Sequence, residues 1–181
     1  MQDWGGPIGF DLASRLPERV HGFVIGNTLA WPLERTGHKM FSAIMGGWHG
    51  RFATWSFNGV VRFFLWKGVA SKLSDTELAM YLAPFEKRED RSPTHIFPLQ
   101  LSAAAPFLDR VNLHLNVLAD RPALIVWGLR DFAFQAPERE RFELLLPKHR
   151  TVLLRNAGHF TQEDASEEIA AAIRDWYKKR L

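Results

Sequence analysis

Three short apolar runs, each bounded by turn-forming residues, constrain the fold of this chain more than any other feature. They are VHGFVIGN, PALIVWG and RTVLLRN. Runs of this length, rich in branched side chains and flanked by Gly, Pro or Asn, are typical of buried strands. Helical patterns follow the second and third runs, in PERERFELLLP and ASEEIAAAIRDWYKKRL. Strands that alternate with helices predict an α/β fold with a parallel sheet and helical crossovers.

The segment after the first run has a different character. Residues 31–108 contain several prolines and helical patterns but no strand pattern. In SDTELAMYL, Ser74 precedes an acidic first turn with Glu77 three residues later, which predicts a capping box at the start of a helix. The glycine-rich stretch GGWHG is expected to be a connecting loop. We therefore predict a core formed by residues 1–30 and 109–181, with residues 31–108 inserted as a helical cap.

The composition excludes several classes of protein. A length of 181 residues fits one domain, and the absence of cysteine rules out disulfides, thiolate nucleophiles and Cys-ligated metals. The net charge is +3, but basic and acidic residues are interleaved, as in FEKREDRS, so no nucleic-acid partner is expected. No apolar run approaches the roughly 20 residues that cross a bilayer, and no signal-peptide pattern is visible. We therefore expect no membrane partner and a cytoplasmic location.

Motifs for metals and nucleotide cofactors are also missing. The stretch GGPIG lacks the spacing of a dinucleotide-binding loop, and no GKS or GKT triplet occurs. Neither HExxH nor another paired-histidine spacing is present. We therefore expect no metal and no cofactor.

Large aromatic residues are unusually frequent. The chain has seven Trp and fourteen Phe, many of them between residues 31 and 66. Such a cluster is typical of an aromatic-lined cavity. A bulky core or a buried interface explains the composition equally well.

The N-terminal stretch MQDWGG has features of a nucleophile elbow, the sharp turn that raises a reactive side chain above a sheet. Small residues must follow the nucleophile, and Gly5 and Gly6 supply them after Asp3. The following GGPIGFDLASRLP carries apolar residues at helical spacing (Ile8, Leu12 and Leu16), which predicts a helix over residues 7–16. The alternative is that Asp3 is only the N-cap of this helix.

Two further residues follow predicted strands. Asp131 lies a few residues beyond PALIVWG, at the sheet edge where open α/β sheets place their active sites. It is alternatively only a cap or turn former. Among the seven histidines, His159 alone follows the end of a predicted strand and precedes a helix, and Gly158 before it is expected to permit an unusual backbone. The order Asp3, Asp131, His159 reproduces the nucleophile, acid, base order of α/β-hydrolases.

Four stretches together resemble the haloalkane dehalogenases of the α/β-hydrolase superfamily: QDWGGPIG, VIGNTLAWP, PALIVWGLRD and NAGHFTQED. The resemblance implies that Asp3 displaces halide from carbon and forms an alkyl ester. It implies that His159 activates the water that hydrolyses this ester, and that Asp131 orients the histidine. Trp4 would donate its indole N–H to the leaving halide. The implied partners are a small halogenated hydrocarbon, water and the halide product, with the oligomeric state left open.

Some members of this family place the acid at the end of the strand before the cap, where this chain has Asn27. Asn27 cannot ionise, so Asp131 is the preferred acid. Epoxide hydrolases share much of the pattern, but they usually have His in place of Gln2 and use two cap tyrosines, whereas this chain has only Tyr81 and Tyr177. A halide substrate is therefore favoured over an epoxide.

The resemblance also implies polypeptide upstream of Met1, including the strand that feeds the elbow and a His-Gly-rich loop. We therefore expect an N-terminally truncated member, the C-terminal part of an α/β-hydrolase fold with about three strands. An inactive chain that needs the missing half is a further alternative. The second halide donor of the family is an Asn of the early loop or a cap tryptophan, and the sequence does not choose among its tryptophans (Trp31, Trp48, Trp55 and Trp66).

Overall fold

The computed structural model describes residues 1–33 and 36–179. Its centre is a parallel sheet in the order β1-β2-β3. The strands are β1 (Phe23–Gly26), β2 (Ala123–Gly128) and β3 (His149–Leu154). They coincide with the three apolar runs, so the predicted α/β class and the parallel pairing are confirmed. Every residue of β2 is buried because this strand has a partner on both sides and helices on both faces.

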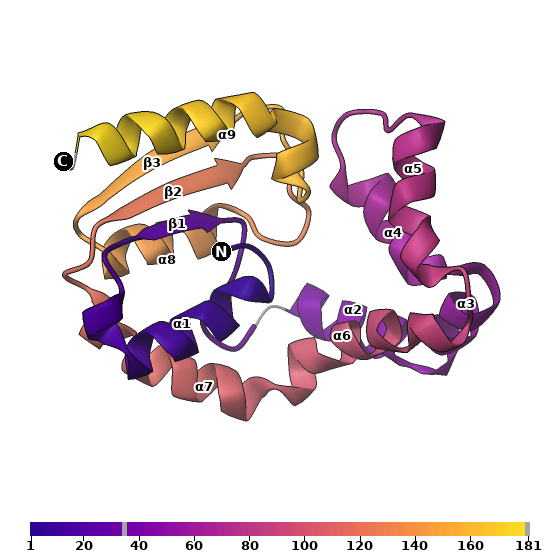
Figure 1. The fold of residues 1–181 in the computed structure, drawn as a ribbon. Coiled ribbons are helices and arrows are strands. Elements are labelled where there is room, and N and C mark those ends of the chain that lie inside the picture. Colours follow the sequence, from indigo (N-terminus) through magenta and orange to yellow (C-terminus); the bar gives the residue numbers. More distant parts are fainter. Residues whose placement is uncertain (34–35, 180–181) are drawn as a thin grey trace.

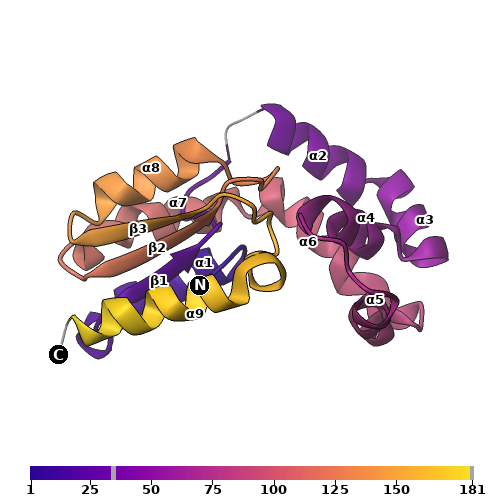
Figure 2. The ribbon, with the colours of Figure 1, turned by 90° about the horizontal axis from the view of Figure 1, so that it is seen from above.

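Helices cover both faces of the sheet (Figures 1 and 2). On one face lies α9 (Thr161–Lys178), which packs on Leu124, Val126 and Leu154. The other face carries the larger core, with Phe10, Trp127 and Phe142 among its fully buried rings. The helices on that side are α1 (Gly5–Arg15), α7 (Ala105–His114) and α8 (Ala136–Leu145).

Five further helices, all between β1 and α7, stand beyond the carboxyl ends of the strands (Figure 1). They are α2 (Thr36–Gly46), α3 (Trp48–Phe57), α4 (Gly59–Gly68), α5 (Asp75–Leu82) and α6 (Ser92–Ala103). Short 3-10 turns occur at Pro17–Arg19, Ala83–Phe85, Glu89–Arg91 and Leu115–Leu118. The capping box predicted for α5 is present, since the Ser74 side chain accepts from the Glu77 N–H and the Glu77 carboxylate accepts from Ser74 N–H.

The boundaries predicted for the cap fall within segments that pack on the core. Trp31 and Leu33, at the N-terminal edge of the predicted cap, are buried in the larger core cluster. At the other edge, Leu108 lies inside α7, which packs against α1. The division into core and cap stays a prediction.

One local prediction about the helices was wrong. The GGWHG stretch is not a loop: Gly46 ends α2, Gly47 separates the two helices, and Trp48 already begins α3. Gly50 lies within α3, where a Cβ would come within 1.9 Å of the Met45 carbonyl oxygen, so the close approach of α2 explains this glycine.

The apolar stripe of α1 does not face the core of the described chain. Ile8 and Leu12 are 60% and 58% exposed, whereas Phe10 and Ala13, on the opposite side of the helix, are buried. Helical spacing therefore predicted the helix correctly, but tertiary packing decided which of its faces is covered.

No described helix is both long and apolar enough to cross a membrane.

Candidate active site

Asp3 sits in a strained turn at the carboxyl edge of the sheet. Residues 1–3 run parallel to β1, and the Asp3 N–H donates to the Asn27 carbonyl at 2.9 Å. The Asp3 φ angle is +45°, a left-handed conformation that non-glycine residues rarely adopt and that clusters at functional sites. The Thr28 hydroxyl donates to the Asp3 carbonyl oxygen at 2.5 Å and holds the turn. This is the geometry predicted for a nucleophile elbow.

The two glycines after the elbow have different importance. A Cβ on Gly6 would lie 1.9 Å from the Thr28 hydroxyl oxygen, so only glycine fits there. A Cβ on Gly5 would meet nothing within 4 Å. The alternative role of Asp3 as an N-cap was wrong, because the N-cap of α1 is Trp4 and no side chain caps this helix. The Asp3 carboxylate is instead 46% exposed toward the cavity.

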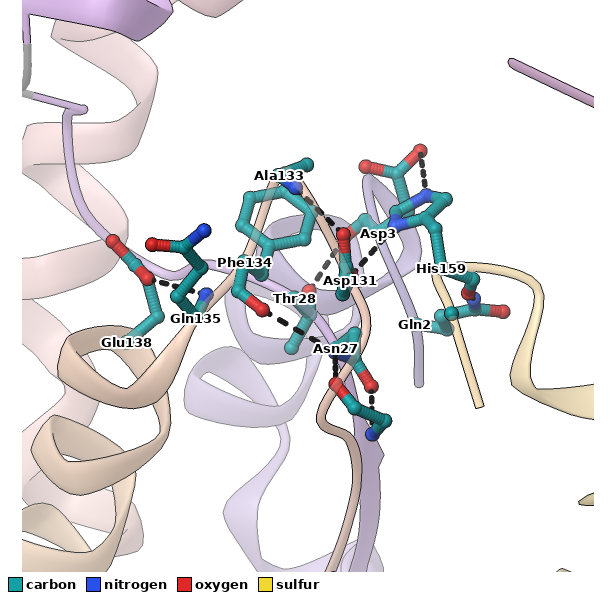
Figure 3. A network of polar contacts seen from close by, with 12 residues as sticks. Gln2, Asp3, Asn27, Thr28, Asp131, Ala133, Phe134, Gln135, Glu138 and His159 are labelled. Carbon is teal, nitrogen blue, oxygen red and sulfur yellow. Dashed lines mark hydrogen bonds and ion pairs between the residues drawn. The ribbon is translucent and has the colours of Figure 1, made fainter. Parts of the chain in front are cut away.

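The three residues singled out from the sequence meet in space. His159 is 5% exposed, and its Nδ1 lies 2.9 Å from an Asp131 carboxylate oxygen. On the other side of the ring, Nε2 lies 3.8 Å from an Asp3 carboxylate oxygen. The imidazole therefore stands between the two carboxylates (Figure 3). The second Asp131 oxygen accepts from the Ala133 N–H at 2.7 Å, so Asp131 both forms a turn and binds the histidine.

Electrostatics favour the charged form of this histidine. Burial lowers the pKa of His159, but the neighbouring Asp131 and Asp3 carboxylates outweigh burial and raise it to about 10. A cation flanked by two carboxylates is stabilised in a poorly solvated site. Near neutral pH the resting site therefore holds an imidazolium ion.

Gly158 has another role than the one predicted. No described glycine has a positive φ, so Gly158 does not supply an unusual backbone. A Cβ at this position would instead lie 2.3 Å from the carbonyl oxygen of Gly68 at the end of α4. Glycine is needed because the backbone of the loop that carries His159 contacts the backbone at the end of α4.

Asn27 has a structural function that the sequence did not reveal. Its amide nitrogen donates to the Gly128 carbonyl at 3.0 Å and to the Phe134 carbonyl at 3.3 Å, while its oxygen accepts from Gly128 N–H at 2.7 Å. The fully buried Asn27 thus fastens the end of β1 to β2 and to the loop that carries Asp131 (Figure 3). The only indication of this function in the sequence was the position of a polar residue at the end of a predicted buried strand.

A cavity of about 700 Å³ opens over the Asp3 carboxylate. Its wall is mainly aromatic and aliphatic, which agrees with one of the explanations left open for the aromatic content, and includes seven phenylalanines: Phe41, Phe64, Phe85, Phe97, Phe132, Phe134 and Phe160. Trp4 lines it beside Asp3. Polar groups reach the wall at Gln2, His38, Tyr81 and Thr94.

None of the four tryptophans considered as a second halide donor lines this cavity. Trp31 is buried in the core against Phe142. Trp48 and Trp66 are 73% and 75% exposed, and Trp55 is 41% exposed beneath the Arg51 guanidinium. In the described residues, no three His, Asp or Glu side chains gather in a way that would hold a metal ion.

Comparisons with known proteins agree with this geometry. Residues 2–166 match the model of a family described as alpha/beta hydrolase fold. The chain belongs to the α/β-hydrolase fold family. The fold predicted from the order of Asp3, Asp131 and His159 is thereby confirmed.

Relatives of this α/β-hydrolase include the family predicted by resemblance. Haloalkane dehalogenase 2 of Mycobacterium tuberculosis (H37Rv) is 36% identical over 174 residues, covering 95% of this chain and 61% of the relative. A cis-3-alkyl-4-alkyloxetan-2-one decarboxylase of Xanthomonas campestris is 33% identical over 187 residues, covering 99% and 62%. The crystal structure of haloalkane dehalogenase DbeA from Bradyrhizobium elkani superposes with a TM-score of 0.84 at 25% identity, covering 97% and 64%.

The predicted resemblance to haloalkane dehalogenases is confirmed by these matches. Together with the family model, they support an enzyme of the α/β-hydrolase superfamily. The chain spans about three fifths of the length of the curated relatives it matches.

Proposed function

We propose that this α/β-hydrolase, as part of its whole protein, converts haloalkanes to alcohol and halide through an ester on Asp3. The observation that carries the proposal is the Asp3–His159–Asp131 arrangement at the floor of an apolar cavity. An apolar wall suits an alkyl substrate, and a carboxylate in a strained turn above the sheet is presented for attack.

In the first step, an Asp3 carboxylate oxygen forms a bond to the carbon that carries the halogen. The carbon–halogen bond breaks and its electron pair leaves with the halide. Trp4 lines the same cavity, and an indole N–H is a donor that cannot accept, which suits stabilisation of an anion. Aspartate fits this chemistry better than serine because its alkyl ester keeps a carbonyl carbon that water can attack later.

In the second step, His159 Nε2 takes a proton from water, and the hydroxide attacks the ester carbonyl carbon. The ester bond breaks, the added hydroxyl gives its proton to the departing oxygen, and the alcohol leaves. The Asp3 carboxylate returns, and the proton taken from water stays on His159 until it is lost to solvent after the next ester has formed. Asp131 holds Nδ1 and stabilises the imidazolium that forms.

The charges around His159 change between the two steps. In the resting site the Asp3 and Asp131 carboxylates raise the pKa of His159 to about 10. Esterification removes the negative charge of Asp3, and the pKa of His159 falls because burial then opposes a single carboxylate. The histidine therefore becomes a competent base once the ester has formed.

Epoxide hydrolysis is less well supported. Only Tyr81 brings a phenol to the cavity wall among the described residues, and its hydroxyl donates to Glu163 at 2.5 Å. Tyr177 lies in α9 and is 58% exposed. A pair of tyrosines that could protonate an epoxide oxygen is therefore missing from the described cavity.

The test is halide release from a panel of 1-bromoalkanes, measured for the 181-residue chain and for a form extended upstream in frame. Styrene oxide and a cis-3,4-dialkyloxetan-2-one belong in the same panel, the latter because of the relative named for that substrate. Asp3→Asn should abolish halide release, whereas Asp109→Asn, an exposed carboxylate on α7, should leave it unchanged. Turnover of styrene oxide without any halide release would refute the dehalogenase proposal.

A further inference from the structure

An acidic pair at the start of α9, Glu163 and Asp164, links the histidine loop to the cap. The Tyr81 hydroxyl of α5 donates to the Glu163 carboxylate at 2.5 Å. Asp164 is half-buried and accepts hydrogen bonds from two chain segments about 90 residues apart. Neither residue takes part in the two steps of the proposed reaction.

The Asp164 carboxylate is fully used as an acceptor. One oxygen accepts from Gly158 N–H at 2.8 Å and from Ala70 N–H at 2.9 Å. The other accepts from Ser71 N–H and the Ser71 hydroxyl, both at 2.8 Å, and from Ala70 N–H at 3.1 Å. Burial raises the pKa of Asp164, but the N–H donors of Gly158, Ala70 and Ser71 outweigh burial and lower it. Hydrogen bonds to a charged acceptor are the strong ones.

Other contacts place the same two loops against each other. Phe160 N–H, just after the histidine, donates to the Gly68 carbonyl at 3.1 Å. Gly158 and Gly68 touch along their backbones, as described above. The Asp164 bonds therefore fall at the point where the histidine loop meets the connection from α4 to α5.

The backbone of α9 is bent at this point. Ala165 has φ −151° and ψ 37°, which is not helical, so the turn that carries Asp164 departs from the axis of the longer helix. Helix kinks need an identifiable cause, and the four donors collected by Asp164 supply one here.

We propose that Asp164 is a positioning residue that holds the Gly158 backbone, aims His159 between the two carboxylates, and fixes the cap connection to the same point. This role rests on the proposed function, because Asp164 is assigned to the step that uses His159. Ester formation needs no proton transfer to the histidine, so Asp164 acts on ester hydrolysis.

Asp164→Asn is the decisive change. The amide NH₂ must replace one of the two oxygens, so it faces either Gly158 N–H or the two Ser71 donors, and a donor then opposes a donor. Glu167→Gln, an exposed acid one turn further along α9, removes the same charge without these contacts and is the matched control.

The first measurement is hydrogen exchange of peptides that cover residues 68–71 and 157–160 in the 181-residue chain. Asp164→Asn should speed exchange in both segments by about 10- to 100-fold, the loss expected for hydrogen bonds to a charged group. Glu167→Gln should change neither segment. Unchanged exchange in Asp164→Asn overturns the proposal, and this holds whether or not the chain releases halide.

The second measurement is pre-steady-state halide release from a 1-bromoalkane by the active form. Asp164→Asn should still give a burst of about one halide per active site, followed by turnover slowed about 10- to 100-fold by the misplaced base. Equal loss of burst and turnover would overturn the positioning role. If Asp164→Asn does not fold, Ser71→Ala removes a single donor and should give the same pattern more weakly; no change in that variant would also overturn the proposal.

Discussion

Replacing Asp131 with Asn keeps the size of the side chain and removes its charge. The structure dictates how the new amide is oriented. One Asp131 oxygen accepts from Ala133 N–H at 2.7 Å, so the Asn oxygen must occupy that position. The NH₂ group then replaces the oxygen that lies 2.9 Å from His159 Nδ1.

This orientation forces the wrong tautomer on the histidine. Nδ1 must accept a hydrogen bond from the amide, so the ring proton moves to Nε2, the nitrogen that should take a proton from water. The same inversion in a serine protease triad lowers kcat by about 10⁴. We expect ester hydrolysis by Asp131→Asn to slow by about 10³- to 10⁴-fold, which corresponds to roughly 4–5 kcal/mol of activation free energy.

Ester formation should survive the same change, because Asp3 attacks carbon without help from His159. The assay is rapid-quench halide release from a 1-bromoalkane, with mass spectrometry of the peptide that ends at Arg15. Asp131→Asn should release about one halide per active site at a rate within roughly tenfold of the unmodified protein. The Asp3 peptide should then carry the mass of the alkyl group.

Asp109→Asn is the control variant, because it makes the same chemical change at an exposed carboxylate of α7. Urea unfolding shows whether each variant is folded. The mechanism would be refuted if folded Asp131→Asn turned over substrate repeatedly at near-normal rates. It would also be refuted if the burst and the turnover disappeared together, with no alkyl group on the Asp3 peptide.

The remaining predictions concern stability and halide binding. Between pH 6.5, the ordinary pKa of His159, and its raised pKa of about 10, the folded protein binds more protons than the unfolded chain. The free energy of unfolding should therefore fall as the pH rises through this range, by up to about 1.4 kcal/mol per pH unit. The urea midpoint of His159→Gln should not show this pH dependence. Gly6→Ala should destabilise by about 1–3 kcal/mol because its Cβ would lie 1.9 Å from Thr28 Oγ1, whereas Gly5→Ala, with open space around it, should be neutral or stabilising in urea unfolding. Trp4→Phe keeps a ring but loses the indole N–H, so bromide should inhibit about tenfold more weakly; unchanged inhibition would remove Trp4 from the halide site.

Local patterns accounted for the three strands and for the start of α5. These features were predictable because they depend on neighbouring residues: branched runs for β1, β2 and β3, and the Ser74–Glu77 capping box for α5. Asp131 and His159 follow β2 and β3, and the order of Asp3, Asp131 and His159 along the chain also predicted that the three residues meet. Carboxyl ends of parallel strands share one edge of a sheet, so sequence order alone places these residues close together.

Features that depend on contacts between distant segments were decided only by the tertiary structure. The spacing of Ile8 and Leu12 predicts a helix but cannot say that Phe10, on the other face, is the residue that packs on the sheet. Composition indicated an aromatic cavity, yet phenylalanines rather than Trp48 and Trp66 line it, because the orientation of α3 and α4 leaves these two tryptophans exposed.

The polar supports of the site show the same division. Asp3, Asp131 and His159 could be proposed from the sequence as nucleophile, acid and base, because reaction chemistry restricts which side chains can take these roles. Asn27 and Asp164 could not be named, because any residue able to accept or donate at the right place would serve. Their hydrogen bonds, from Asn27 to Phe134 and from Ala70 to Asp164, exist only once folding has brought together residues that are 107 and 94 positions apart.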